Sequence, residues 1–248
     1  MRLLTTRVQV AHRVPLSRAP ILAGFHPRTL HRLLAALLCA GSVLAVTASP
    51  DLDRTHVIAE KRYGAETAAR VNDWRRMLAD AQELPEATQL ERVNTFFNRR
   101  IQFEDDSVVW KQADYWATPL ETMGRKAGDC EDFAIAKYAS LRLLGVPAEK
   151  LRLIYVRAQI GGSGSTISQA HMVLGYFTSP DAEPLVLDNL TGEIRPAARR
   201  PDLFPVFSFN DAGLWVAGAQ QSSADPTARL SRWRDVLQRM RDEGMPLQ

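Results

Sequence analysis

Residues 128–147 read GDCEDFAIAKYASLRLLGVP, and this stretch predicts a buried helix with a cysteine on its first turn. Asp129 suits the N-cap position, acidic residues follow it, and Gly145 with Pro147 ends the helix. Apolar residues fill most positions between these signals. A helix over residues 130–144 should therefore pack inside the fold rather than on its surface.

The segments on either side of this helix differ in their periodicity. Helical spacing of apolar residues dominates upstream, whereas runs typical of strands dominate downstream. We expect helices over residues 56–82, 86–99 and 226–243, an irregular segment over 101–127, and strands over 151–157, 171–177, 185–187 and 192–195. Helices followed by strands predict an α+β fold, in which N-terminal helices and the cysteine-bearing helix pack on an antiparallel sheet.

The length and composition are those of one globular domain with an added leader. The chain has 248 residues, of which 46% are hydrophobic and 24% are charged, and these values are ordinary for a folded protein. Residues 1–48 hold six arginines and no acidic residue, and the rest of the chain holds 25 basic and 28 acidic side chains. Because the basic charge belongs to the leader, the composition gives no support to nucleic-acid binding.

Residues 1–48 are predicted to form a secretory leader. The arginines precede an apolar segment over residues 33–46, which is too short for a membrane span and suits a signal peptide. Ala48 offers a small residue for cleavage, while an uncleaved anchor and a mitochondrial-type presequence stay open as alternatives. We expect export, a domain over residues 49–220, and a C-terminal amphipathic helix within 221–248 that packs on that domain.

Removal of the leader, which contains Cys39, would leave Cys130 as the single cysteine. A lone thiol in an oxidising compartment forms no internal disulfide, so it is either buried and inert or reactive. At a helix N-terminus the thiol lies near the positive end of the helix dipole, which favours thiolate. Free backbone N–H groups there can also stabilise an oxyanion. This position favours a nucleophile over a structural cysteine.

A nucleophilic thiol needs a base, and the base needs a group that orients it. Two histidines follow the leader, and His56 lies in a charged helix where it is expected at the surface. His171 begins an apolar strand, and a turn at residues 178–181 would place Asp188 opposite it on the same face of a hairpin. A slip of one residue would turn Asp188 to the other face. The alternative for His171 is a structural role.

Segments around these three residues resemble the bacterial transglutaminase-like cysteine proteinases, in particular their LapG group. The segments are residues 127–137 (AGDCEDFAIAK), 169–174 (QAHMVL) and 183–189 (EPLVLDN), with further similarity at 116–121 and 201–210. The resemblance implies a transglutaminase/papain-like fold. In that fold Cys130 would be the nucleophile, His171 the general base and acid, and Asp188 the orienting residue.

The resemblance also implies a dependence on Ca²⁺, which Asp129 and Glu131 would hold with Asp132 as a third ligand. Carboxylates crowded around a thiolate raise the pKa of the thiol by repulsion, and a bound Ca²⁺ would offset their charge through the oxygen ligands it prefers. An equally good interpretation of the residues alone is that Asp129 and Asp132 cap the helix while Glu131 complements its dipole.

Proteinases of this group act in the periplasm of Gram-negative bacteria. The resemblance therefore implies a large surface adhesin as substrate, cut in its N-terminal region, with biofilm dispersal as the outcome. It further implies control by an inner-membrane cyclic-di-GMP receptor that sequesters the protease, which would be monomeric or receptor-bound. These implications come from the resemblance alone, since a fold does not fix a function.

Other function classes stay open on the residues alone. The same triad serves transglutaminases and amidases, because a thioester intermediate passes either to an amine or to water. A non-catalytic binding module of this fold would be expected to lack a triad member. Zinc chemistry is disfavoured, because one cysteine and two histidines offer too few ligands. Candidates for a second oxyanion donor are Trp110, Trp116 and Gln112, with aromatic packing as the alternative for both tryptophans.

Overall fold

The computed structural model describes residues 49–162, 164–217, 219 and 221–247. The predicted leader over residues 1–48, including Cys39, lies outside the described residues. Within the described part of the chain, no helix combines the length and the apolar character needed to cross a bilayer.

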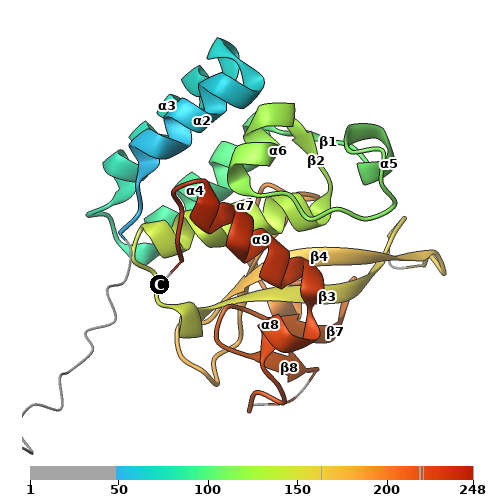
Figure 1. Cartoon of the computed structure of the whole chain (residues 1–248). Helices are drawn as coiled ribbons and strands as arrows, with labels where there is room; N and C mark the ends of the chain where they lie inside the picture. The colour runs from blue at the N-terminus through green and yellow to red at the C-terminus, as the bar shows by residue number, and fades with distance from the viewer. Residues whose placement is uncertain (1–48, 163, 218, 220, 248) are drawn as a thin grey trace, which may run out of the picture. The chain divides into compact units, whose positions relative to one another are not determined.

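Helices dominate the first half of the described chain and strands the second (Figure 1), which confirms the predicted α+β fold. The helices are α2 (Leu52–Tyr63), α3 (Ala65–Ala81), α4 (Glu86–Arg100), α5 (Asp106–Val109), α6 (Pro119–Arg125), α7 (Cys130–Leu143), α8 (Pro226–Arg229) and α9 (Ser231–Asp242). The strands are β1 (Gln102–Phe103), β2 (Ala127–Gly128), β3 (Leu151–Gln159), β4 (Ser168–Tyr176), β5 (Leu185–Leu187), β6 (Arg195–Pro196), β7 (Leu203–Phe209) and β8 (Leu214–Val216).

One antiparallel sheet supports helix α7. Its strand order is β6-β5-β4-β3-β7-β8, and β4 pairs along its whole length with β3, so that His171 lies opposite Val156. Helix α7 packs on β3 and β4 on one side and on α4 and α6 on the other. Nearly every residue of α7 is therefore buried, as the apolar sequence predicted.

Several predicted segments differ from the structure. The helix expected over residues 226–243 is divided into α8 and α9, the strand expected over 192–195 is the short β6, and strands β7 and β8 were not predicted. The single helix expected over residues 56–82 is split into α2 and α3 at Gly64, whose φ of 86° favours glycine. The segment 101–127, expected to be irregular, contains α5, α6 and the short parallel pair β1–β2. Helix α6 begins at a capping box, in which Thr118 and Glu121 bond each other's backbone N–H groups.

The predicted register of the hairpin after His171 is wrong by two residues. Leu174 pairs with Leu187, because residues 177–184 form a longer connection than the expected four-residue turn. A shift of two residues preserves the face on which each side chain lies. Asp188 follows directly after β5 and keeps its place on the same face as His171.

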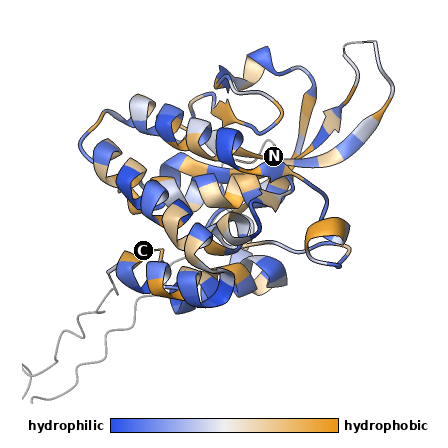
Figure 2. Ribbon diagram, turned by 90° about the horizontal axis from the view of Figure 1, so that it is seen from above, coloured by the Kyte–Doolittle hydropathy of each residue, from blue (hydrophilic) through white to orange (hydrophobic). Residues whose placement is uncertain are grey.

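The C-terminal helix closes the fold. Helix α9 buries Trp233, Val236, Leu237 and Met240, and the Trp233 indole donates a 3.0 Å hydrogen bond to the Asn210 carbonyl. Hydrophobic and hydrophilic residues alternate along the outer helices, as expected for amphipathic helices with one buried side (Figure 2).

Just beyond α9 the chain contacts the start of α2. The Asp51 N–H donates a 2.8 Å hydrogen bond to the Gly244 carbonyl, and the hydroxyl of Thr55 donates one of 2.7 Å to the carbonyl of Glu243. The start of α2 is therefore joined to the end of α9.

This closure predicts a difference between two glycines with the same backbone conformation. Gly145 and Gly244 have φ values of 88° and 90°, but only at Gly244 would a Cβ collide, with the Asp51 carbonyl oxygen. Gly145→Ala should cost about 1 kcal/mol of unfolding free energy for its backbone alone. Gly244→Ala should cost about 3 kcal/mol, because the collision adds to this term. Urea unfolding measures both, and equal losses would contradict the closure.

Candidate active site

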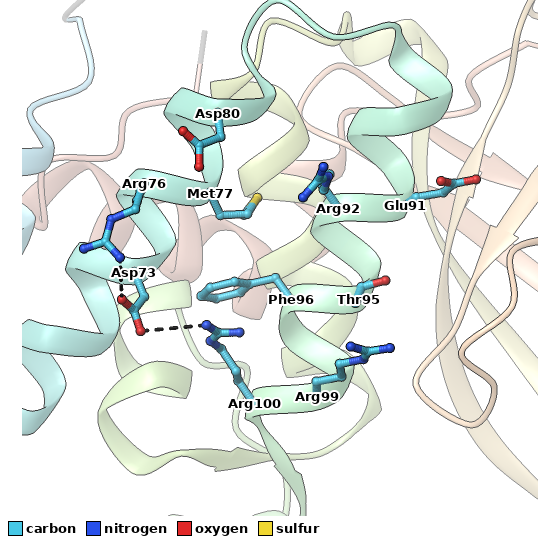
Figure 3. A pocket seen from close by; sticks show the side chains of 10 residues that line it. All are labelled: Asp73, Arg76, Met77, Asp80, Glu91, Arg92, Thr95, Phe96, Arg99 and Arg100. Atoms are coloured by element: carbon cyan, nitrogen blue, oxygen red, sulfur yellow. Dashed lines mark hydrogen bonds and ion pairs between the residues drawn. The ribbon is translucent and has the colours of Figure 1, made fainter.

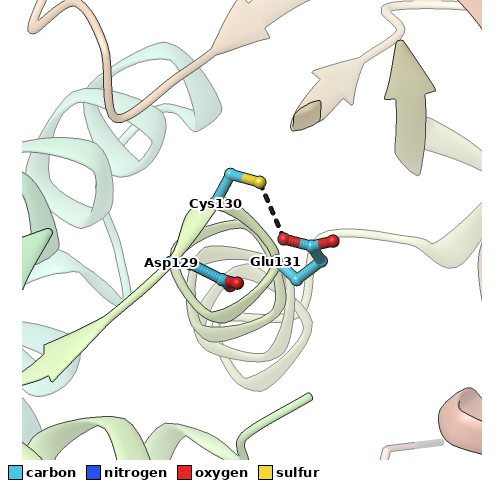
Figure 4. A group of neighbouring side chains, drawn as sticks. All are labelled: Asp129, Cys130 and Glu131. Atoms are coloured by element: carbon cyan, nitrogen blue, oxygen red, sulfur yellow. Dashed lines mark hydrogen bonds between the residues drawn. The ribbon is translucent and has the colours of Figure 1, made fainter. Parts of the chain in front are cut away.

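The N-terminus of α7 presents the candidate nucleophile inside the molecule. Cys130 is 9% exposed, and its thiol donates a 2.7 Å hydrogen bond to a carboxylate oxygen of Glu131 (Figure 4). Helix α7 packs on β4, and the backbone N–H of Met172 on that strand acts to lower the pKa of the thiol. Since Met172 follows His171 on β4, the thiol lies beside the strand that carries the candidate base.

His171 and Asp188 form a buried pair. The Nε2 atom of His171 lies 2.8 Å from Oδ1 of Asp188, and the two side chains are 2% and 0% exposed. An imidazole that donates through Nε2 keeps its Nδ1 lone pair free to accept a proton. The structure thus brings the predicted base and orienting acid together, although the predicted pairing of their strands is wrong.

Asp188 stays ionised in spite of its burial. Burial would raise its pKa, but the hydrogen bond and charge of His171, the Leu190 N–H and Arg200 outweigh this effect. Together they lower the pKa of Asp188 to about 2. The Nη2 atom of Arg200 lies 2.8 Å from Oδ2 of Asp188, and it also bonds Asp202 at 2.8 Å.

A second buried basic residue, Lys137, interacts with the charge of Asp188. Its side chain is buried in the middle of α7, and its Nζ atom has no hydrogen-bond partner among the described residues. Burial lowers the pKa of Lys137 to about 7, and the charge of Asp188 opposes this effect. Sequence reasoning missed both Lys137 and Arg200. A lysine inside an otherwise apolar helix is a signal that could have identified the first.

Acidic side chains crowd the other side of Cys130. One group joins Asp129 and Glu131 to the thiol, and a second joins Asp129 and Asp132 to Asp106, with the potential ligand atoms of each group within 4.8 Å of one another. One carboxylate oxygen each of Asp106, Asp129 and Asp132 is buried without a hydrogen-bond partner in the described chain. Buried, unpaired carboxylate oxygens fit a hard cation such as Ca²⁺.

Local packing explains why these oxygens converge. Asp129 holds the N-cap position of α7 but makes no side-chain cap bond. Asp132 instead accepts a 2.7 Å hydrogen bond from the Ala117 N–H through its Oδ1 atom, and its Oδ2 atom lies against Gly128. A Cβ at Gly128 would lie 2.5 Å from Oδ2, so only glycine leaves this space open.

Asp106 is the acid that the sequence interpretation missed. Strand β1 pairs in parallel with β2, so Phe103 lies opposite Gly128 and the chain after β1 runs beside the start of α7. This pairing brings Asp106 to Asp129. The only sequence signal was the acidic run at residues 104–106, which is too common at surfaces to indicate a site.

The pKa values of Asp106, Asp129, Asp132 and the Cys130 thiol are all raised at this site. Burial and mutual repulsion raise the pKa of Asp129 to about 9, and they raise the pKa values of Asp132 and Asp106 as well. Burial and the charges of Glu131 and Asp129 raise the pKa of the Cys130 thiol far above its ordinary value. A cation in the acidic group would offset this repulsion.

The three proposed oxyanion donors lie in different surroundings. Trp110 packs on Tyr115 at 4.5 Å and beneath Arg125, and its indole N–H is buried without a partner in the described chain. Trp116 stacks on Phe209 and lines a cavity together with Glu131. Gln112 is exposed on another surface depression.

A separate groove lies between α3 and α4 (Figure 3). Its charged lining consists of Arg76, Arg92, Arg99, Arg100, Asp73, Asp80 and Glu91, and Asp73 pairs with both Arg76 and Arg100. None of the candidate catalytic or acidic residues lines this groove. Opposite charges that largely neutralise one another give the groove no clear preference for a charged ligand.

Known proteins share both the sequence pattern and the fold. A profile of the family described as bacterial transglutaminase-like cysteine proteinase matches residues 55–222. EGTA-treated LapG of Legionella pneumophila is 37% identical with a TM-score of 0.68, and the match covers 78% of this chain and 99% of that chain. Among curated proteins there is no significant match.

Two further LapG structures from the same organism are similar. One is 37% identical with a TM-score of 0.66, and the match covers 78% of this chain and 99% of that chain. The structure described as calcium-bound is 38% identical with a TM-score of 0.66, and the match covers 77% of this chain and 99% of that chain.

The Asp188 network predicts a pH-dependent loss of stability on Arg200→Leu. A buried carboxylate that loses a partner costs about 3 kcal/mol near neutral pH. Because the folded pKa of Asp188 lies below its unfolded value, the pair contributes fully above pH 4 and less as the pH falls toward 2. The difference in unfolding free energy between wild type and Arg200→Leu should therefore become smaller as the pH falls from 4 toward 2.

Unfolding titrations at several pH values measure this difference. Asp202→Asn is the matched control, since it removes the outer, more exposed partner of Arg200 and should cost less than about 1 kcal/mol. If the difference in unfolding free energy between wild type and Arg200→Leu stays constant from pH 7 to pH 2, Arg200 does not stabilise the fold through ionised Asp188.

Proposed function

The chain belongs to the bacterial transglutaminase-like cysteine proteinases, and from this premise we propose that it is a calcium-dependent endopeptidase acting through Cys130, His171 and Asp188. The observation that carries the proposal is the buried 2.8 Å contact between His171 and Asp188, on the side of the sheet where α7, which carries Cys130, packs on β4. All three residue types that acyl transfer needs are present, which favours an enzyme over a binding module of the same fold.

In the proposed reaction, Nδ1 of His171 takes the thiol proton and Sγ of Cys130 attacks the carbonyl carbon of a peptide bond. Asp188 holds the imidazole through Nε2 and stabilises its protonated form. Backbone N–H groups at the start of α7 face the developing oxyanion. The imidazolium gives its proton to the leaving amine, a thioester forms, and water activated by the same imidazole hydrolyses it.

We propose that Asp129 and Asp132, two of the three expected ligands, hold Ca²⁺ with Asp106 as a further ligand. Glu131, the other expected ligand, lies in the group that contains the thiol. The support is the set of buried, unpaired carboxylate oxygens and the calcium-bound structure of a LapG 38% identical to this chain. The ion supplies positive charge that offsets the acids around the thiol. Asp106, Asp129 and Asp132 would supply oxygen ligands to the ion, and the Ala117 N–H orients Asp132.

The same premise extends to location, substrate and control. We propose that residues 1–48 direct export to the periplasm and that the substrate is the N-terminal region of a large surface adhesin. Release of the adhesin would disperse a biofilm. An inner-membrane cyclic-di-GMP receptor would sequester the protease. The support is membership of the family together with the arginine-rich, acid-free leader.

Alkylation of Cys130 tests the nucleophile and the ion together without a substrate. At neutral pH the thiol should react at least about tenfold faster with Ca²⁺ than with chelator, since each unit of pKa changes the thiolate fraction tenfold. His171→Ala should abolish the fast rate. Rates that match a free cysteine in both conditions would refute the protease.

Variants of two neighbouring acids distinguish the loss of a Ca²⁺ ligand from the general loss of one negative charge. Asp106→Asn removes a buried carboxylate of the acidic group and should weaken the response of the alkylation rate to Ca²⁺. Asp105→Asn removes the same charge one residue away at an exposed position and should leave the response intact. Equal responses in both variants would exclude Asp106 from the ion site.

Adhesin retention on cells tests the proposed substrate. Deletion of the gene should keep the adhesin on the cell surface under conditions that lower cyclic-di-GMP, because no protease would then cut it. Surface adhesin is measured by immunoblotting of the cell-bound and released fractions. The wild-type gene should restore release, whereas a Cys130→Ala gene should not. Unchanged release after deletion would refute this substrate and leave the peptidase chemistry untouched.

A further inference from the structure

A cavity of about 400 Å³ lies beside the candidate nucleophile. Glu131 lines this cavity, and its carboxylate is 2.7 Å from the sulfur of Cys130. A volume of this size accommodates one or two side chains of a peptide. A peptide whose scissile bond lies at Cys130 would therefore have neighbouring side chains within reach of the cavity.

Part of the lining of the cavity is aromatic and apolar. Tyr155 of β3 and Phe207 of β7 stack with ring centroids 5.2 Å apart and planes inclined by 13°. Trp116 forms another part of the wall and is fixed from behind by Phe209 at 5.5 Å. Leu230 completes this surface. Such walls favour an apolar side chain, because burial against aromatic rings removes its surface from water.

One cation in the lining is left without an acidic partner. Arg232 pairs with Asp114 at 3.1 Å, and Glu131 is engaged by the thiol. Arg229 lines the same cavity, is exposed, and forms no ion pair within the described chain. An unpaired guanidinium beside an apolar wall favours a carboxylate on the bound peptide.

Contacts behind the walls hold the cavity open. The Arg239 guanidinium donates a 2.6 Å hydrogen bond to the carbonyl of Trp116 and also pairs with Glu121. Trp233 anchors the start of α9 through its buried indole. The segment with Trp116 and the α8–α9 junction therefore form fixed walls, and a preformed site loses little ordering free energy on binding.

We propose that this cavity is a substrate subsite, which takes an apolar side chain close to the scissile bond while an acidic residue of the same extended peptide meets Arg229. This inference rests on the proposed endopeptidase function and adds a sequence preference to it. Tyr155, Phe207 and Leu230 select the apolar residue, and Arg229 selects the acidic one.

A randomised synthetic peptide library tests the subsite. The full chain, with Ca²⁺ present, is incubated with the library, and mass spectrometry identifies the cleaved positions. Wild type should prefer an apolar residue at one fixed position and an acidic residue at another. Arg229→Glu should replace the acidic preference with a basic one, by roughly threefold to fivefold, as expected for a partly exposed ion pair. Tyr155→Ala should weaken the apolar preference roughly tenfold.

Each preference is a ratio between peptides cut by the same enzyme sample. It therefore does not depend on how much of a variant is folded. Arg241→Glu is the matched control: it makes the same charge change on α9, away from the cavity, and should keep the wild-type preferences. Cleavage with unchanged preferences in Arg229→Glu would overturn the subsite and leave the endopeptidase standing. Cleavage by wild type no greater than by Cys130→Ala would overturn both.

Discussion

Helix α7 is enclosed by α4 and α6 on one side and by β3 and β4 on the other. Its N-terminus is therefore buried inside the protein. A buried helix end must find partners for its free backbone N–H groups. Asp129 does not supply this cap, and Asp132 turns back toward Ala117. Carboxylate oxygens are left unpaired as a result, and the thiol lies among them. The burial of this helix therefore creates an acidic group that could hold a cation.

The two sides of the site carry opposite charge. Acids surround Cys130, whereas Asp188 lies beside Arg200 and His171. His171 connects the two sides, since it binds Asp188 and lies on the strand that borders the thiol. A cationic environment around the orienting acid keeps it ionised, and an acidic environment around the thiol keeps it protonated. If Cys130 is the nucleophile as proposed, positive charge added on the acidic side would favour its thiolate form.

The sequence predicted those features that depend on local patterns. The caps and apolar run of α7 predicted its bounds and its burial, and strand alternation put His171 and Asp188 on one face despite a register error of two residues. Features that depend on long-range pairing were missed. Asp106 reaches the site through the β1–β2 pair, and Arg200 reaches Asp188 from the segment before β7. No local pattern distinguishes such residues from ordinary surface charges.

Helix α9 packs in the core and also supports the candidate site. Arg239 holds the carbonyl of Trp116, and the next residue, Ala117, holds Asp132 through its N–H. One short segment therefore links α9 to the acidic group on one side and to the wall of the cavity on the other. Because the Gly244 carbonyl accepts a hydrogen bond from Asp51 at the start of α2, the end of α9 is itself held by α2. The position of the acids around Cys130 thus depends on contacts made by both ends of the folded domain.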